Sequence, residues 1–366
     1  MKKTPWFGGA AAAALIALGV AGCGTSSSNN NFAPEFAPFA TVAPIVNLGL
    51  WVANGTNVVE FTPTQTTTVG VSDPIPTVSI NSPSFTAPQG VQFDNAGDLW
   101  VVDGGDSTHV PAIFEFTGTQ LSNLHSVNNP VPAVTLTSPS FVFPQQAVFH
   151  GSSLWVTDNG ANAVFTFAAN QLSAGGSQTP AITMTSTTAF SGPLGLAFDP
   201  LSGNLWVANN ASNTIYGFTA ASLPTTDGSF TVTPNVILSS TSGSIEAPWG
   251  LVFDLSGNLF SSNANSPDTV VEFGHSSLAA TGTPAPILTL QPTTDGTFDT
   301  LNSPNGIALD NLGDLAAVSS QSPFGVAVYG AGQLASGGPI VPDFLLVGTN
   351  TTLNAPAGNT FGPVVP

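Results

Sequence analysis

The sequence predicts an all-β protein, a six-bladed β-propeller with four antiparallel strands in each blade. The first observation is a block that recurs every fifty residues or so, roughly the period of repeat architectures such as propellers. The second is that the segments within a block alternate apolar and polar residues, with no helical periodicity. A Leu-Trp pair marks each block, at Leu50-Trp51, Leu99-Trp100, Leu154-Trp155 and Leu205-Trp206, with degenerate copies at Leu259-Phe260 and Leu315-Ala316.

The second block shows how one blade is built. Pro88-Gln89-Gly90 opens it, and the alternating residues that follow predict a half-buried strand. A turn rich in Asn, Gly and Asp precedes the Leu-Trp strand, because these residues tolerate turn backbone conformations. The expected strands cover residues 91–94, 99–102, 112–116 and 133–136, with a loop containing Gln120-Leu121 before the last one.

The later blocks repeat the same order of strands. Opening strands are expected at residues 147–149, 195–198, 250–253 and 306–309. Third strands are expected at residues 164–167, 215–218, 270–273 and 326–329, and fourth strands at residues 182–184, 236–238, 287–290 and 344–347.

The two ends of the array are complementary. The first block starts at its second strand, residues 48–53, and has no Pro-x-Gly opener, whereas Pro356-Ala357-Gly358 near the C-terminus matches one. We therefore expect the C-terminal strand to become the innermost strand of blade one. Closure of this kind removes exposed sheet edges.

The N-terminus has the order of an export signal. Lys2 and Lys3 precede a short apolar run, and Val20-Ala21-Gly22-Cys23 resembles a bacterial lipobox. The resemblance implies cleavage before Cys23 and a lipid on that cysteine. We expect a lipoprotein signal peptide at residues 1–22, a Ser/Asn/Pro-rich tether at 23–45 and the propeller at 46–366. Gly24 after the cysteine favours the outer membrane of the cell envelope, because the Asp that retains some lipoproteins at the inner membrane is absent.

Composition excludes some partners. Lys2 and Lys3 are the only Lys or Arg residues, so their removal would take the formal charge from −18 to −20. Nucleic-acid binding is excluded, because it depends on cations that neutralise phosphates. The expected membrane contact is the lipid on Cys23, which is the only cysteine, so no intramolecular disulfide is possible. Low charge fits an acidic habitat or compositional drift equally well, and the two interpretations stay open.

The repeat pattern resembles the NHL-repeat group of six-bladed propellers. The pattern is Pro-x-Gly, an apolar-polar strand ending in Asp, then Gly-Asn-Leu-Trp-Val-Ala-Asn as at residues 203–209, and it covers residues 46–366. This group neighbours the streptogramin lyases and the gluconolactonase/senescence-marker propellers. The resemblance is specific for architecture, because such propellers host hydrolases, lyases and binding scaffolds.

The propeller geometry predicts one mouth, where the openers and the loops after the Leu-Trp strands meet. Asn and Asp there would offer oxygen ligands to a cation such as Ca²⁺ or Mg²⁺, or to a small polar ligand. Alternatively, these side chains satisfy turn backbone. Asp94, Asp199, Asp254 and Asp310 fall in turns of the opposite face and are expected to be structural. The candidate binding residues are Asn54, Gln89, Asp103, Gln145, Asp158, Asn209, Trp249, Asn263 and Asn305.

An enzyme of the gluconolactonase type is the alternative. The resemblance implies a divalent metal held by a Glu from Glu-x-Pro, an Asn from Pro-Asn-Gly and an Asp from Pro-Asp-Gly. Glu246 and Asn305 match the first two motifs, and no Pro-Asp-Gly occurs, so Asp103 or Asp158 would have to supply the third ligand. His109, in a small polar loop, is the only histidine expected near the mouth, as a general base or metal ligand. The sequence favours a binding scaffold for an unknown protein or small polar ligand.

Overall fold

The computed structural model describes residues 48–66, 69–124, 126–295, 298–335 and 340–365. The chain divides into two units, Met1–Glu35 and Phe36–Pro366, and every described residue belongs to the second. The expected signal peptide, Cys23 and the tether therefore lie outside the described residues. No described helix has the length and apolar character needed to cross a membrane.

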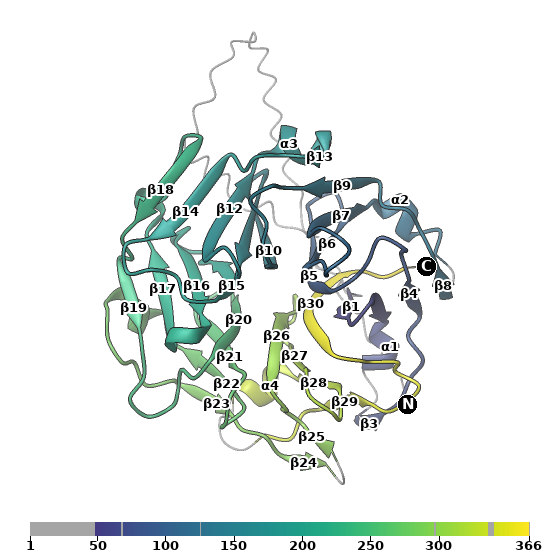
Figure 1. The fold of residues 1–366 in the computed structure, drawn as a ribbon. Helices are drawn as coiled ribbons and strands as arrows, with labels where there is room; N and C mark the ends of the chain where they lie inside the picture. Colours follow the sequence, from purple (N-terminus) through teal and green to yellow (C-terminus); the bar gives the residue numbers. More distant parts are fainter. Residues whose placement is uncertain (1–47, 67–68, 125, 296–297, 336–339, 366) are drawn as a thin grey trace, which may run out of the picture. The chain divides into compact units, whose positions relative to one another are not determined.

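The second unit is a six-bladed β-propeller, as the sequence predicts (Figure 1). Each blade is an antiparallel sheet of four strands, ordered from the innermost outward. Blade one has β30 (Pro356–Pro363), β1 (Leu48–Asn54), β2 (Asn57–Phe61) and β4 (Val78–Ile80). Blade two has β5 (Pro88–Phe93), β6 (Leu99–Asp103), β7 (Ala112–Phe116) and β9 (Val134–Thr137). Blade three has β10 (Pro144–His150), β11 (Ser153–Asp158), β12 (Ala163–Phe167) and β14 (Ile182–Ser186).

The second half of the ring repeats this order. Blade four has β15 (Pro193–Phe198), β16 (Leu205–Asn209), β17 (Thr214–Phe218) and β19 (Val236–Leu238). Blade five has β20 (Pro248–Phe253), β21 (Leu259–Asn263), β22 (Thr269–Phe273) and β23 (Leu288–Leu290). Blade six has β26 (Pro304–Leu309), β27 (Leu315–Ser319), β28 (Gly325–Tyr329) and β29 (Phe344–Val347).

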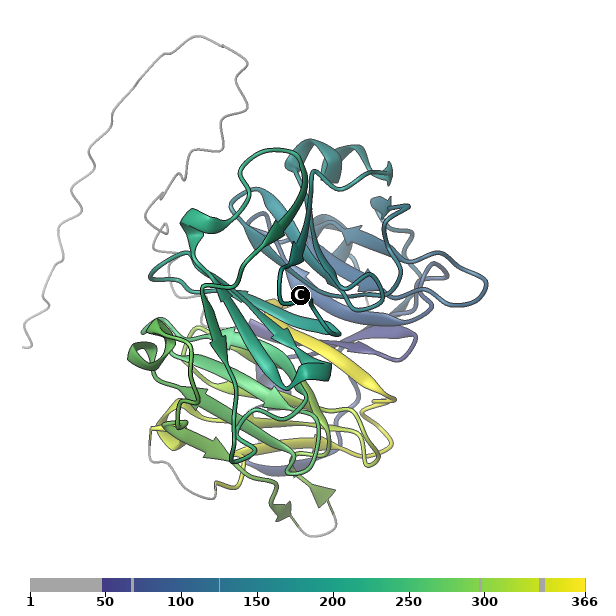
Figure 2. The ribbon, with the colours of Figure 1, turned by 60° about the vertical axis from the view of Figure 1, so that its left-hand side comes forward.

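The innermost strands form a closed ring around the axis (Figures 1 and 2). Each contacts the innermost strand of both neighbouring blades, in the order β30, β5, β10, β15, β20, β26 and back to β30. The expected closure is confirmed, because β30 pairs antiparallel with β1, with Leu50 opposite Phe361 and Trp51 opposite Thr360. The last strand of the chain thus completes the first blade.

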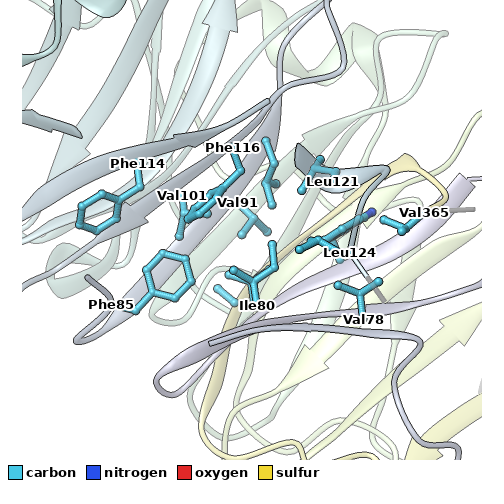
Figure 3. Close-up of a cluster of buried hydrophobic side chains, with 14 of the residues drawn as sticks. Val78, Ile80, Phe85, Val91, Val101, Phe114, Phe116, Leu121, Leu124 and Val365 are labelled. Carbon is cyan, nitrogen blue, oxygen red and sulfur yellow. The ribbon is translucent and has the colours of Figure 1, made fainter. Parts of the chain in front are cut away.

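The hydrophobic core lies between the blades as six separate clusters, one at each interface. Figure 3 shows the cluster between blades one and two, where Ile80 of blade one packs against Phe85 and Val91 of blade two. Since no blade buries its apolar faces alone, each depends on both neighbours.

The Leu-Trp tryptophans bridge neighbouring blades. Trp51 meets Phe93 edge to face with ring centroids 5.6 Å apart, and Trp100 meets Phe149 at 5.8 Å. In each pair the phenylalanine belongs to the innermost strand of the next blade. The same arrangement joins Trp155 to Phe198 and Trp206 to Phe253.

Short helices follow the third strands: α1 (Pro63–Thr66), α2 (Gly118–Leu121), α3 (Ala169–Ala174), α4 (Ala331–Leu334), and the 3₁₀ turns η2 (Ala220–Ser222) and η3 (His275–Ala279). A further 3₁₀ turn, η1 (Asn210–Ser212), follows β16. Gln120 is typical of these helices: its Oε1 accepts from the Thr117 N–H at 2.9 Å, and its Nε2 donates to the Val131 carbonyl at 2.9 Å. The Thr-x-x-Gln spacing is a capping-box signal that the sequence interpretation missed.

Added strands extend four of the blades. β8 (Ser126–Asn128) pairs with β4, β13 (Gly176–Ser177) with β9, β18 (Gly228–Val232) with β14, and β3 (Gly70–Ser72) with β29. All four pairings are parallel, and each added strand comes from the next blade's loop between its third and fourth strands. They cover outer sheet edges that would otherwise be open to another chain. A small hairpin, β24 (Thr294–Asp295) with β25 (Phe298–Asp299), completes the described elements.

Candidate functional site at the mouth of the propeller

The openers and the ends of the second strands meet at one face of the ring, here called the mouth. In every blade the opener proline pairs with the last residue of the second strand, for example Pro88 with Asp103 and Pro304 with Ser319. The turns that hold Asp94, Asp199, Asp254 and Asp310 lie at the other ends of these strands. Asp94 Oδ1 accepts from the backbone N–H groups of Ala96 and Asp98, which confirms its expected structural role.

The last residue of each second strand, here called the anchor residue, is buried. The anchor residues are Asn54, Asp103, Asp158, Asn209, Asn263 and Ser319, each at most 3% exposed. Each one accepts a hydrogen bond from the backbone N–H two residues before the opener proline of its own blade. The donors are Asn354, Thr86, Val142, Ser191, Glu246 and Asn302, in the same order.

Two anchor residues, Asp103 and Asp158, are carboxylates, and backbone N–H groups of the loops donate hydrogen bonds to both. Asp103 accepts from the N–H groups of Thr86, Ala87 and Gly105, and Asp158 from those of Val142, Phe143 and Ala161. The anchor residues therefore hold the loop ahead of each opener, which is the turn-backbone alternative raised by the sequence. Because the side-chain oxygens of the anchor residues already accept hydrogen bonds from the loops, this geometry does not support a ligand-binding role for them.

The glycines of the openers allow the innermost strands to approach closely. A Cβ atom on Gly250 would lie 2.6 Å from the Asn305 carbonyl oxygen, and one on Gly306 would lie 2.7 Å from that of Ala357. Gly90 faces the Gln145 carbonyl oxygen in the same way. The Pro-x-Gly motif thus lies inside a strand and not in a turn, and its glycine lets the backbone of the neighbouring innermost strand come close.

Blade three departs from this pattern, because Gln146 replaces the opener glycine. Its Nε2 donates to the Gln89 carbonyl at 3.0 Å, so its side chain fills the axis. Together with Trp249 and Asn359, Gln146 encloses a cavity of about 30 Å³, room for about one water molecule. The axis is therefore filled beneath the mouth.

Above this filled axis lies an open cavity of about 430 Å³, a size in the range of small-molecule sites. Its lining is polar and carries no charged side chain among the described residues. The lining residues are Phe143, Gln145, Asn159, Leu194, Asn210, Ala247, Trp249, Ala264, Asn265, Ser303, Asn305, Ser320 and Gln321.

The cavity brings together three residues that the sequence predicts as ligand contacts: Gln145, Trp249 and Asn305. Trp249 also packs against Leu194 and Ala357, so an apolar group forms part of the floor. Gln89 does not line the cavity, and its Nε2 donates to the Ala87 carbonyl at 3.2 Å.

Sequence interpretation missed the amides that follow the anchor residues. Asn159 follows Asp158 directly and Asn210 follows Asn209, while Asn265 and Gln321 come two residues after their anchors. The signal was present, because amides recur just after the second strand in these four blades.

The backbone is strained where the loops enter this cavity. Ala247 and Ser303, each directly before an opener proline, have φ values of +45° and +50°. Left-handed backbone is uncommon for residues other than glycine. Ala355, before the opener Pro356, also has a φ of +50° but does not line the cavity, so this conformation belongs to the repeat and not to the site alone. Ala247 is held there by the Asn213 side chain, whose Oδ1 accepts from its N–H at 2.7 Å.

The residues of the enzyme alternative do not converge. Asn305 lines the cavity, whereas Glu246 does not, and the Glu246 carboxylate accepts from Asn213 Nδ2 at 3.0 Å. The carboxylate oxygens of Asp103 and Asp158 accept hydrogen bonds from backbone N–H groups. Among the described residues no three of His, Cys, Asp and Glu gather as a metal-binding group. The side chains present therefore do not fit a divalent metal at this position.

His109 lies in an exposed turn, away from the cavity lining. Its Nδ1 is 3.2 Å from Asp106 Oδ1 and 2.8 Å from the Thr108 hydroxyl. The Thr108 hydroxyl, the Thr108 N–H and the His109 N–H all donate to Asp106, and these hydrogen bonds hold the pKa of its carboxyl well below the usual range. The loop thus has the geometry of a closed polar turn.

Three glutamates with a raised pKa lie on the third strands, and Asp310, whose pKa burial also raises, lies in a turn of the opposite face. Burial raises the pKa of Glu60 to about 7. Burial, followed by the nearby carboxyls of Asp98 and Asp94, raises the pKa of Glu115 to about 7. The pKa of Glu272 is raised by burial and by Asp254. None of these groups lines the mouth cavity, so they bear on stability and not on the site.

Comparison with known proteins shows the fold alone. No protein-family model matches the chain, and no curated protein matches it in sequence. Among solved structures, a proposed 6-phosphogluconolactonase from Bacteroides fragilis is similar with a TM-score of 0.56 at 12% identity, covering 87% of this chain and 98% of its own. A chain of the nidogen/laminin complex has a TM-score of 0.54 at 13% identity, with coverage of 87% and 98%. The periplasmic gluconolactonase of Pseudomonas aeruginosa has a TM-score of 0.52 at 15% identity, with coverage of 87% and 100%.

Proposed function

We propose that this chain is a lipid-anchored, extracytoplasmic binding scaffold that holds a ligand at the propeller mouth. The observation that carries the proposal is the cavity of about 430 Å³ lined by amides, hydroxyls and an indole. Catalysis by acid–base or nucleophilic chemistry needs a positioned titratable or nucleophilic group. Binding needs only donors, acceptors and a shaped surface, which are what this lining offers.

The test of this function is ligand screening on the full chain by calorimetry and ligand-observed NMR. Asn305→Leu, in the cavity, is compared with Asn95→Leu, an exposed residue in a turn of the opposite face. We expect bound compounds to lose at least tenfold in affinity with the first variant and to be unaffected by the second. Binding that ignores Asn305→Leu would place the ligand elsewhere and contradict the proposal.

Anchoring and location form a separate part of the proposal. The support is the sequence Val20-Ala21-Gly22-Cys23 and the tether at residues 23–45. We expect lipid on Cys23 to be the membrane contact, the outer membrane to be the location, and nucleic acid not to bind. Fatty-acid labelling should be lost in Cys23→Ser, and the matured chain should resist trypsin, because no Lys or Arg follows Cys23. Labelling that persists in Cys23→Ser would refute the anchor.

A metal-dependent lactonase or lyase is the second candidate, favoured by the names of two similar structures. It would need Glu246, Asn305 and Asp103 or Asp158 to rearrange around a divalent cation, Ca²⁺ or Mg²⁺, because these side chains do not converge in this structure. Metal analysis of the purified protein, with Glu246→Gln in parallel, separates the candidates. Stoichiometric metal that is lost in Glu246→Gln, together with lactone hydrolysis, would establish the enzyme. Metal-free protein that leaves lactones intact is the outcome expected for a scaffold.

A further inference from the structure

We infer that the mouth cavity selects an uncharged, hydroxyl-rich ligand, chemically an uncharged saccharide, and that Gln145 is its specificity-determining donor. The inference rests on the proposed function, because it names the ligand class of the same cavity. Three observations carry it: an unpartnered buried amide, the absence of charge in the lining, and the mixture of donors and acceptors around an apolar floor.

Gln145 is the first observation. Its side chain is 3% exposed and lines the cavity, yet its Nε2 has no hydrogen-bond partner. Burial of an amide donor without a partner costs stability, so folded proteins rarely keep one. An acceptor oxygen from a ligand would satisfy it.

Gln89 occupies the equivalent position in blade two and provides the internal comparison. Its Nε2 donates to the Ala87 carbonyl at 3.2 Å, and it does not line the cavity. The two glutamines at the same place in the repeat therefore differ: Gln89 is half-buried and bonded to the Ala87 carbonyl, whereas Gln145 is buried with an Nε2 that has no partner. The fold itself satisfies one amide and leaves the other to face the cavity.

Charge is the second observation. Among the residues that the structure describes, the lining holds no Asp, Glu or His, and Lys2 and Lys3 are the only Lys or Arg residues in the sequence. An anionic ligand would find no counter-charge there and would enter the field of a chain with a formal charge of −18. A cation would have to give up its hydration without a carboxylate, because Asp103 and Asp158 are bonded to backbone. An uncharged ligand avoids both the repulsion that an anion would meet and the loss of hydration that a cation would suffer.

The third observation is the chemistry of the lining. Asn159, Asn210, Asn305 and Gln321 each carry both a donor and an acceptor, and Ser303 and Ser320 add hydroxyls. A ligand hydroxyl is likewise donor and acceptor, so a ring of hydroxyls can satisfy several of these groups together. Trp249 and Leu194 supply apolar surface for the C–H faces of such a ring.

The experiment uses matched probe pairs on the full chain, measured by calorimetry and saturation-transfer NMR. Glucose, galactose and maltose are compared with glucuronate, galacturonate and glucose 6-phosphate. We expect uncharged sugars to bind and their anionic counterparts to bind at least tenfold more weakly. Gln145→Leu should lower sugar affinity at least tenfold, whereas Gln89→Leu should leave it unchanged.

Thermal unfolding separates recognition by Gln145 from a structural role. Gln145→Leu removes an unsatisfied buried amide, so its Tm should equal or exceed that of the wild type. A clear drop in Tm would overturn the role of Gln145 as a ligand donor.

The binding outcomes distinguish the proposal that the mouth is the binding site from the proposal that its ligand is an uncharged saccharide. Anionic probes that bind as well as sugars, and are lost with Asn305→Leu, would overturn the ligand class and leave the mouth site standing. Sugars that bind equally well to wild type, Asn305→Leu and Gln145→Leu would overturn the mouth site itself. Failure of every sugar to bind the wild type would overturn the ligand class.

Discussion

Single buried side chains decide how the mouth is held. Six residues at the same place in the repeat, Asn, Asp or Ser, bond the loop before each opener. Where the anchor is Asp103 or Asp158, its carboxylate accepts from two successive loop N–H groups, since it offers two acceptor oxygens. Where the anchor is Asn209 or Asn263, it accepts from one loop N–H. The next loop N–H donates to an asparagine of the preceding blade, Asn162 or Asn213.

Asp103→Ala tests this anchoring role. The change removes the partner of one buried and two half-buried backbone N–H groups, so we expect a loss of roughly 2–4 kcal/mol in unfolding free energy. Asp103→Asn should lose clearly less, because Asn54, Asn209 and Asn263 do the same work in other blades. Urea denaturation followed by tryptophan fluorescence measures both. An alanine variant as stable as the wild type would refute the role.

Glu60 makes stability depend on pH. The side chain is fully buried; its Oε1 accepts from the Val365 N–H at 3.2 Å, and its Oε2 has no partner. Burial raises the pKa of Glu60 from 4.5 to about 7 in the folded protein. Because the folded pKa lies above the unfolded one, its contribution is complete below pH 4.5 and is lost as the pH rises through about 7.

We therefore expect the protein to be more stable near pH 5 than near pH 8. Glu60→Gln should change little near pH 4.5 and should gain up to about 3 kcal/mol near pH 8. Denaturation midpoints at the two pH values measure this. The result also bears on the low charge of the chain: greatest stability at neutrality, with loss in acid, would count against an acidic habitat.

At the scale of the element, the opener serves to bring innermost strands together. Proline starts each innermost strand. In every blade except blade three, the glycine two residues later leaves space for a carbonyl of the next blade. Gly306→Ala would put a Cβ 2.7 Å from the Ala357 carbonyl and 2.8 Å from Gly358 Cα, both backbone atoms that cannot move aside.

We expect Gly306→Ala to cost roughly 3 kcal/mol or to prevent soluble expression. Gly332→Ala is the control, because that glycine lies in α4 with nothing within 4 Å of the added Cβ. The control should be neutral or slightly stabilising, since alanine is the better helix former. Equal melting temperatures for the two variants would show that close approach is not the reason for the opener glycine.

At the scale of the molecule, stability depends on closure, because each cluster of the core is shared by two blades. Removal of residues 356–366 would take the innermost strand from blade one and expose the edge of β1. We expect such a truncated chain to be insoluble or to unfold in several steps.

A circular permutant tests closure without loss of residues. Joining residue 365 to residue 48 through a flexible linker, with new termini between β14 and β15, keeps every strand pair. It should fold with a single transition similar to that of the wild type. A truncated chain with the stability of the permutant would contradict the dependence on closure.

The sequence by itself determined the ring. The spacing of the Leu-Trp pairs fixed the number of blades, and the opener at Pro356 predicted which strand would join β1, because pairing follows from pattern and turn residues that are local in the chain. Tertiary structure alone decided which polar side chains face the mouth. Asp103 and Asn209 accept hydrogen bonds from loop N–H groups that have no strand partner, while Gln145 and the amides after the anchors line the cavity. Satisfaction of buried backbone depends on neighbours that only the closed ring brings together, so residue type at a repeat position could not reveal it.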